Sequence, residues 1–124
     1  MDIENIQTPV YILEEQKLKQ NLELLKYVQQ RSGAKILLAL KGFAFRASFD
    51  MVREYLQGCC ASGLYEAKLA YEEMQKEVHT YSPAFKESEI DEIIAISDHV
   101  VFNSFSQWQK FKEKAIGKVS CGLR

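Results

Sequence analysis

Long apolar runs are missing from the sequence. No stretch approaches the roughly 20 consecutive apolar residues that a membrane-spanning helix needs, and the opening residues, MDIENIQTPVY, lack the charged-then-apolar pattern of a secretion signal. Basic residues do not cluster either, because 16 Lys and Arg are balanced along the chain by 17 Asp and Glu. This balance argues against nucleic acid or a membrane surface as a partner, and we expect a soluble protein.

Cysteine and histidine are also scarce. The three cysteines are an odd number, and Cys59 and Cys60 are adjacent and poorly placed to bridge each other, so we expect reduced thiols in a cytoplasmic protein that fill space around a short strand. The two histidines, His79 and His99, have no second histidine, cysteine pair or carboxylate at ligand spacing. We therefore predict ordinary packing for both, and no metal site.

The sequence is rich in segments that alternate between strand and helix patterns. Short apolar runs rich in β-branched and aromatic residues alternate with segments of helical spacing. Each strand-plus-helix unit takes about twenty residues, which is typical of a parallel α/β sheet with right-handed crossovers. Strands are predicted at residues 10–13, 35–40, 59–61, 78–81, 100–102 and 119–124.

The helices between these strands carry apolar stripes that predict their buried faces. The first helix is expected to end at Ser32-Gly33, the second to span about residues 47–56, and Ser62 and Ser104 are expected to cap the third and fifth. The side chains expected to face inward are Leu18, Leu22, Leu25 and Val28, then Phe49, Val52 and Leu56, then Leu64, Ala67, Tyr71 and Met74, then Ile90, Ile93 and Ile94, and last Phe105, Trp108 and Phe111.

One lysine dominates the residues that follow the strands. In parallel α/β folds the chemistry collects at the carboxyl ends of the strands, which here carry Lys41-Gly42, Ser62-Gly63, Ser82-Pro83, Asn103-Ser104 and Arg124. Lys41 is the only charged residue of ILLALKGFAF, residues 36–45. Partial desolvation there would lower its pKa and free the amine to attack a carbonyl carbon, such as that of pyridoxal phosphate. Spacing alone leaves open a lysine that simply reaches into solvent.

Several segments carry a resemblance to a known family. TPVYILEEQKLKQNLELL, followed by AKILLALKGFA, resembles the opening of the fold type III pyridoxal-phosphate decarboxylases, the alanine racemase-like barrel group. Within that group, the segments LLALKGFA, CCASGLYEAKLA, HTYSPAFKESEI and VVFNSFSQWQKF are most similar to the carboxynorspermidine (carboxyspermidine) decarboxylases. This similarity runs the whole length of the chain.

The resemblance implies a fold, a reaction and two site residues. Residues 1–124 would be the N-terminal part of a pyridoxal-phosphate-binding (β/α)8 barrel, without the remaining barrel and the C-terminal β domain. Lys41 would be the Schiff-base lysine, and Arg124 would lie near the cofactor. The complete enzyme would be a homodimer that decarboxylates carboxynorspermidine or carboxyspermidine to norspermidine or spermidine, and this part alone would be inactive. Cys59 stands where many relatives carry an acid, so no role of that acid is transferred.

Two alternatives remain open at this point. One is a different amino-acid decarboxylase or racemase of the same fold. The other is a complete flavodoxin-like binding or signalling module, for which 124 residues is an ordinary size. The second is disfavoured because the strand ends carry neither clustered carboxylates nor a Gly-rich turn.

Overall fold

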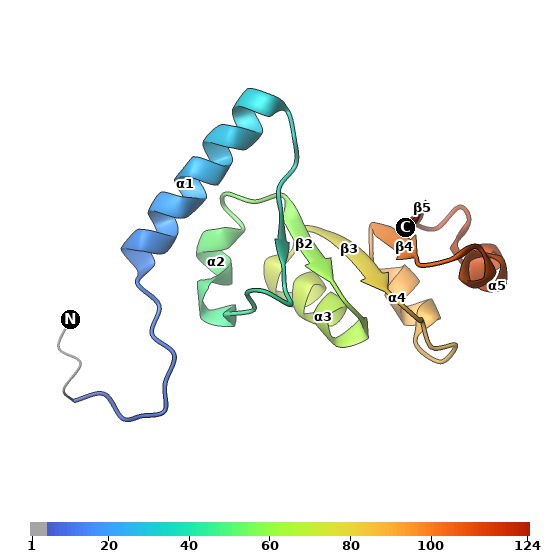
Figure 1. The fold of residues 1–124 in the computed structure, drawn as a ribbon, viewed down its shortest axis with the longest axis horizontal. Coiled ribbons are helices and arrows are strands. Elements are labelled where there is room, and N and C mark those ends of the chain that lie inside the picture. Colours follow the sequence, from blue (N-terminus) through green and yellow to red (C-terminus); the bar gives the residue numbers. More distant parts are fainter. Residues whose placement is uncertain (1–4) are drawn as a thin grey trace.

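The computed structural model describes residues 5–124, so residues 1–4 of the predicted domain lie outside the described part. The described residues form a five-stranded parallel sheet (Figure 1). The strands are β1 (Leu37–Ala39), β2 (Gly58–Ala61), β3 (Glu77–Ser82), β4 (His99–Phe102) and β5 (Ser120–Leu123). The helical elements are α1 (Glu15–Ser32), η1 (Arg46–Ser48), α2 (Phe49–Val52), α3 (Leu64–Leu69), η2 (Ala70–Met74), α4 (Ile90–Ile96) and α5 (Phe105–Ala115). None of these described helices is long and apolar enough to cross a membrane.

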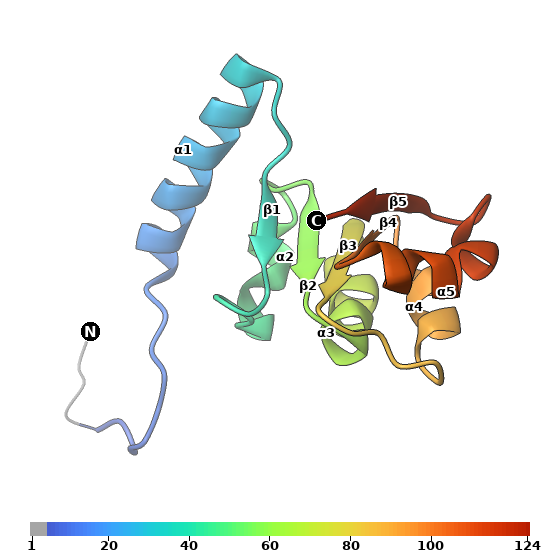
Figure 2. The ribbon, with the colours of Figure 1, turned by 45° about the vertical axis from the view of Figure 1, so that its right-hand side comes forward.

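The strands lie in the sheet in the same order as in the sequence, β1-β2-β3-β4-β5. Right-handed crossovers between successive neighbours place the connecting helices on one side of a sheet, and Figure 2 shows α2 to α5 following the strands in this way. This is the winding of an α/β barrel. A flavodoxin-like module reverses its strand order, so that alternative is wrong.

The two faces of the sheet differ in burial. Side chains that point toward the helices form the core and are almost fully buried, namely Cys59, Ala61, Val78, Thr80, Val100 and Phe102. Their neighbours along the strands point to the opposite face, as the period of two in a β-strand requires. These residues, among them Ala39, Cys60, His79, Tyr81 and Val101, are only partly buried or exposed. The uncovered face is the one that becomes the interior of an α/β barrel.

The first helix is confirmed, with one change on its inner face. It ends at Ser32, and Gly33 follows with a φ of +73°, a left-handed conformation that favours glycine. Leu22 is buried as predicted, but Val28 is 43% exposed and Gln29 is buried instead. The Gln29 amide donates to the carbonyl of Tyr55 at 2.8 Å and accepts from Ile36 N at 2.9 Å. A polar side chain takes this position because it binds backbone groups beside β1.

The strand predicted at residues 10–13 is wrong. This segment has no regular structure, and the side chain of Tyr11 is 91% exposed. Figure 1 shows the chain before α1 running away from the sheet. A strand needs a neighbouring strand to satisfy its backbone hydrogen bonds, and residues 5–124 place none beside this segment.

The second predicted helix is shorter than expected. It begins as the short helical turn η1 and continues in α2 only to Val52, although Phe49, Val52 and Leu56 are all buried as predicted. Gly58 is the first residue of β2 and does not terminate a helix. A Cβ atom there would lie 2.0 Å from the carbonyl oxygen of Glu77, so this glycine allows β2 and β3 to approach.

Tyr71 and Phe105 were predicted to face inward and are mostly exposed. Tyr71 lies in η2, a π-helical turn that changes the residue spacing and brings Ala70 and Met74 into the core. Phe105 is the first residue of α5, and the helix packs through Phe111 and Ala115 further along.

One of the two predicted serine caps is confirmed. The Ser104 hydroxyl accepts a hydrogen bond from Gln107 N at 3.2 Å at the start of α5. Ser62 does not cap α3, because the capping position is taken by Gly63, which has no side chain that could accept a hydrogen bond. The Ser62 N–H instead donates to the Glu66 carboxylate at 2.6 Å. Ser62 therefore stays at the end of β2.

Helix α5 offers a matched test of this packing. Replacing Phe111, which is 2% exposed, with alanine is expected to lower the free energy of unfolding by about 3–5 kcal/mol, because a large buried side chain is lost. Replacing Phe105, which is 74% exposed, should change it by no more than about 0.5 kcal/mol. Chemical denaturation followed by circular dichroism measures both values. Equal losses for the two variants would contradict the packing described.

Candidate functional site

A hollow of about 210 Å³ lies on the uncovered face, at the carboxyl ends of the strands. It contains both residues singled out from the sequence, Lys41 and Arg124. Its other walls come from β1, β2, β3 and β4 and consist of Ala39, Cys60, Ala61, Ser62, His79, Thr80, Tyr81 and Val101. The lining therefore combines two cations with apolar and neutral polar side chains, and includes no carboxylate.

A tight turn after β1 places Lys41 at this hollow. The N–H groups of Gly42 and Phe43 both donate to the carbonyl of Ala39, at 2.9 and 3.1 Å. Leu40 is buried in the core, and its N–H donates to the carbonyl of Cys60 at 3.1 Å. The apolar strand thus fixes the backbone on both sides of the lysine.

The predicted desolvation of Lys41 is wrong for this chain, because its side chain is exposed. The reason is its position in the sheet. Strand β1 is the first in the strand order and has a neighbour only on the side of β2. Nothing in residues 5–124 covers the other side of the lysine.

Arg124 reaches the hollow from the end of β5. Its N–H donates to the carbonyl of Phe102 at 3.0 Å, which extends the β4–β5 pairing by one residue. Its guanidinium carbon lies 4.9 Å from the centre of the Tyr81 ring, a cation–π contact. The Tyr81 hydroxyl in turn donates to the Asn103 side-chain oxygen at 2.7 Å.

Tyr81 is a site residue that the sequence reasoning missed, since it was assigned only to a strand. The alternation of burial along β3 is the signal that could have found it: Tyr81 lies two residues beyond His79, on the same uncovered face. The sequence could not reveal its contact with Arg124, because 43 positions separate the two along the chain (124 − 81).

The residues at the other predicted strand ends form hydrogen bonds within the loops that follow the strands. The Gln107 side chain accepts from Asn103 N at 2.9 Å and donates to the carbonyl of Pro83 at 3.2 Å. This amide joins the end of β3 to the end of β4. Ser82 donates its hydroxyl to the carbonyl of Ala84 at 3.2 Å. These residues shape the rim beside the hollow.

The adjacent cysteines have opposite environments. Cys59 is fully buried in the core, as predicted, and burial raises the pKa of its thiol to about 12, with Cys60 adding to the effect. Cys60 is exposed and lines the hollow, so in residues 5–124 it is not packed around the strand as expected. Burial raises the pKa of the Cys60 thiol, while the nearby Lys41 ammonium acts in the lowering direction.

The expectation that the two histidines lack partners is wrong. His79 and His99 are directly paired across β3 and β4, and their ring centres are 4.0 Å apart. The Glu77 carboxylate contacts His79 Nε2 at 3.2 Å and also forms an ion pair with Lys35. Hydrogen bonds from Lys35 and then His79 lower the pKa of Glu77. Sequence spacing missed this group because its members come from different strands.

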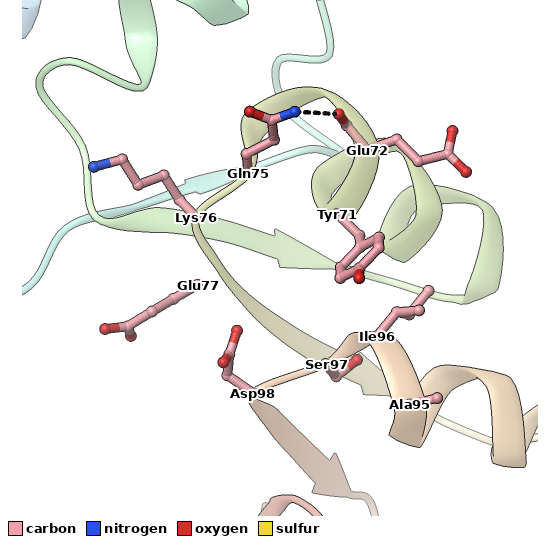
Figure 3. Close-up of a pocket in the computed structure, with 9 residues that line it drawn as sticks. All are labelled: Tyr71, Glu72, Gln75, Lys76, Glu77, Ala95, Ile96, Ser97 and Asp98. Atoms are coloured by element: carbon pink, nitrogen blue, oxygen red, sulfur yellow. Dashed lines mark hydrogen bonds between the residues drawn. The ribbon is translucent and has the colours of Figure 1, made fainter.

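A larger hollow, of about 560 Å³, lies at the opposite ends of the strands, between η2 and the end of α4 (Figure 3). Asp98 is tied into the sheet there, because its carboxylate accepts from Val78 N at 2.8 Å. In α/β barrels the amino ends of the strands serve stability and the carboxyl ends carry chemistry. The smaller hollow around Lys41 is therefore the candidate site.

Cysteine alkylation tests the geometry of the hollow. In the native protein, iodoacetamide at mildly alkaline pH should modify Cys60 and leave the buried Cys59 unmodified. Lys41→Met should slow the modification of Cys60, because loss of the ammonium raises the thiol pKa further and leaves less thiolate. The rate should fall by less than about tenfold, which is the factor that one pKa unit represents. Peptide mass spectrometry gives both rates, and a Cys60 rate unaffected by Lys41→Met would contradict their proximity.

Comparison with models of known protein families gives no match. Curated proteins do match over nearly the whole chain. A carboxynorspermidine/carboxyspermidine decarboxylase of Campylobacter jejuni is 61% identical over 124 residues, which are 100% of this chain and 32% of that protein. One from Herminiimonas arsenicoxydans is 45% identical over 119 residues, 96% of this chain and 32% of the relative. A carboxyaminopropylagmatine decarboxylase of Synechocystis is 40% identical over 123 residues, 98% of this chain and again 32% of the relative.

A solved structure agrees with these matches. The crystal structure of carboxynorspermidine decarboxylase complexed with norspermidine, from Campylobacter jejuni, superposes with a TM-score of 0.93 at 62% identity. The match covers 96% of this chain and 32% of that one. In sequence and in fold, the chain is therefore similar to the carboxynorspermidine/carboxyspermidine decarboxylases, and it spans about a third of the length of the relatives that it matches.

Proposed function

We propose that these residues form the lysine-bearing part of a pyridoxal-phosphate-dependent decarboxylase that acts on carboxynorspermidine or carboxyspermidine. The proposal rests on the position of Lys41, which lies at the carboxyl end of an apolar strand and in the same hollow as Arg124. The similarity to carboxynorspermidine/carboxyspermidine decarboxylases supports the reaction. As proposed from the resemblance, residues 1–124 are the N-terminal part of the barrel.

The residues of the hollow fit pyridoxal phosphate. The cofactor carries an aldehyde, which a lysine amine can bind covalently, and a phosphate, which favours positive surroundings. Lys41 and Arg124 supply an amine and a second positive charge, and no carboxylate among the lining residues opposes an anion. Ala39 and Val101 add apolar surface suited to a flat aromatic ring.

The chain's own residues would hold the cofactor and the substrate in place. Lys41 would hold the cofactor covalently until the substrate amine replaces it, and would then be free to carry a proton on its amine. Arg124 would contribute positive charge at a position fixed by the Tyr81 ring and, through Tyr81, by Asn103. When bound, the cofactor supplies an electron sink for the carbanion that remains after the carboxylate leaves as carbon dioxide.

The names of the relatives support a carboxylated polyamine as the substrate. Norspermidine, bound in the Campylobacter structure, is the amine that decarboxylation of carboxynorspermidine yields. The name of the Synechocystis relative specifies carboxyaminopropylagmatine, which is therefore an alternative substrate for the same decarboxylation. Another amino-acid decarboxylase or a racemase of the same fold remains the alternative reaction. We choose the decarboxylase because all three relatives carry that activity in their names.

We also propose that the complete enzyme is a cytoplasmic homodimer. The homodimer comes from the resemblance to the decarboxylase group. The free thiols of Cys59, Cys60 and Cys121 support the cytoplasmic location, because a reducing compartment keeps thiols unpaired.

Cofactor attachment is tested by trapping. The chain incubated with pyridoxal phosphate and reduced with borohydride should carry the reduced adduct on Lys41, at lower cofactor concentration than on any other lysine, because Arg124 and the apolar walls add binding energy there. Peptide mass spectrometry locates the adduct, and the visible absorbance of the unreduced sample reports occupancy.

Lys35 provides the matched control, since it precedes the same strand at its opposite end. Lys35→Ala should keep both the visible band and the adduct on Lys41, and Lys41→Ala should lose both. Equal labelling of Lys35 and Lys41 across the concentration series would refute the proposed cofactor site.

Activity is tested in a chimera. The 124 residues replace the matching residues of the Campylobacter relative, so that the rest of the protein completes the enzyme. This chimera should release carbon dioxide from carboxynorspermidine or carboxyspermidine, and Lys41→Ala should abolish the release. The 124-residue chain alone should be inactive, because its lysine lies exposed at the edge of an open sheet.

Lys118→Ala is the control variant in the chimera, because Lys118 is exposed and does not line the hollow. It should keep the activity of the parent chimera. A folded chimera that is inactive, or one whose activity survives Lys41→Ala, would overturn the proposed role of Lys41. Turnover of carboxyaminopropylagmatine in preference to the other two substrates would reassign the substrate.

A further inference from the structure

We propose that Glu77, His79 and His99 bind a divalent transition-metal ion such as Zn²⁺, on the uncovered face near the amino ends of β3 and β4. Each residue offers one ligand atom, and these atoms all lie within 4.8 Å of one another. All three side chains are partly buried. Both histidines of the chain are therefore gathered at one point with a carboxylate.

The sheet register creates the group. His79 on β3 is the direct partner of His99 on β4, so their side chains leave the sheet on the same face, with ring centres 4.0 Å apart. Glu77 lies two residues before His79 on β3 and therefore shares that face. Figure 3 shows the Glu77 side chain directed away from Tyr71, at the margin of the hollow beside η2 that Glu77 also lines.

The spacing of the ligand atoms suits one ion. Two ligands bonded to a tetrahedral Zn²⁺ at about 2.0–2.1 Å lie about 3.3 Å from each other. The Nε2 atom of His79 is already 3.2 Å from the Oε2 atom of Glu77. His99 needs only a side-chain adjustment to complete the set, because its ligand atom is no more than 4.8 Å from the others.

Lys35 acts as an outer partner of the carboxylate. Its ammonium binds Oε1 of Glu77, which leaves Oε2 facing His79. Hydrogen bonds of this kind orient ligating carboxylates in metal sites. The Lys35 charge opposes a cation only weakly, because its side chain is 62% exposed and water screens it.

The ligand types indicate the class of metal. Two imidazoles and one carboxylate suit Zn²⁺, Ni²⁺ or Cu²⁺, whereas Mg²⁺ and Ca²⁺ prefer sites made of oxygen ligands. The ion would join β3 to β4, and three protein ligands leave one position for water. His79 also lines the hollow around Lys41, so the ion would form part of that hollow's floor.

Cobalt titration tests the site directly. Co²⁺ added to the purified chain should give visible bands typical of nitrogen and oxygen ligands, and Zn²⁺ should displace it. His99→Ala and Glu77→Gln should each weaken Co²⁺ binding by about tenfold or more, because each removes one of the three ligands. The matched control, Glu113→Gln, replaces an exposed glutamate on α5 and should bind as the parent does.

Two further readouts keep the result interpretable. Zn²⁺ should raise the midpoint of thermal unfolding of the parent chain and of Glu113→Gln, and should raise it less for His99→Ala, because an ion that binds the folded state stabilises it. Circular dichroism checks that each variant folds. Unchanged affinity in folded His99→Ala, a cobalt–thiolate charge-transfer band that disappears in Cys60→Ser, or no Zn²⁺ effect on parent unfolding would each overturn the proposal.

Discussion

The parallel pairing of five successive strands positions everything else in this structure. Each strand hydrogen-bonds to the one that follows it in sequence, and the register sets Ala39 opposite Cys60, Cys60 opposite His79, and His79 opposite His99. All the carboxyl ends consequently meet at one edge of the sheet, and all the crossover helices pack against one face.

The same pairing gives the sheet two unlike faces, and each has its own use. Toward the helices, side chains such as Phe102 and Val100 exclude water and supply the stability of the fold. The opposite face carries polar and reactive groups, including Lys41, Cys60 and the two histidines, which the helix-facing core could not accommodate without partners. Chemistry and stability are thus divided between alternate residues of the same strands.

Charge is also divided along the uncovered face. The hollow at the carboxyl ends contains Lys41 and Arg124 without a carboxylate among its lining residues, an environment that suits an anion. The group near the amino ends contains Glu77 together with two imidazoles, an environment that suits a cation. His79 belongs to both, so the two regions are neighbours. The open sheet leaves them accessible in residues 5–124, and Lys41 is exposed for that reason.

Local sequence patterns predict the alternating elements, most of the core and the position of Lys41 directly after an apolar strand. These follow from local patterns: apolar runs such as residues 36–40 form strands, and the stripe of Ile90, Ile93 and Ile94 faces inward on α4. The tertiary structure sets the contacts between residues far apart in the chain. It left residues 10–13 without a partner strand, moved Tyr71 outward through a π-helical turn, and brought Arg124 onto Tyr81 and His79 beside His99. A pattern records what one segment prefers, whereas strand register sets which side chains meet, and register depends on the whole sheet.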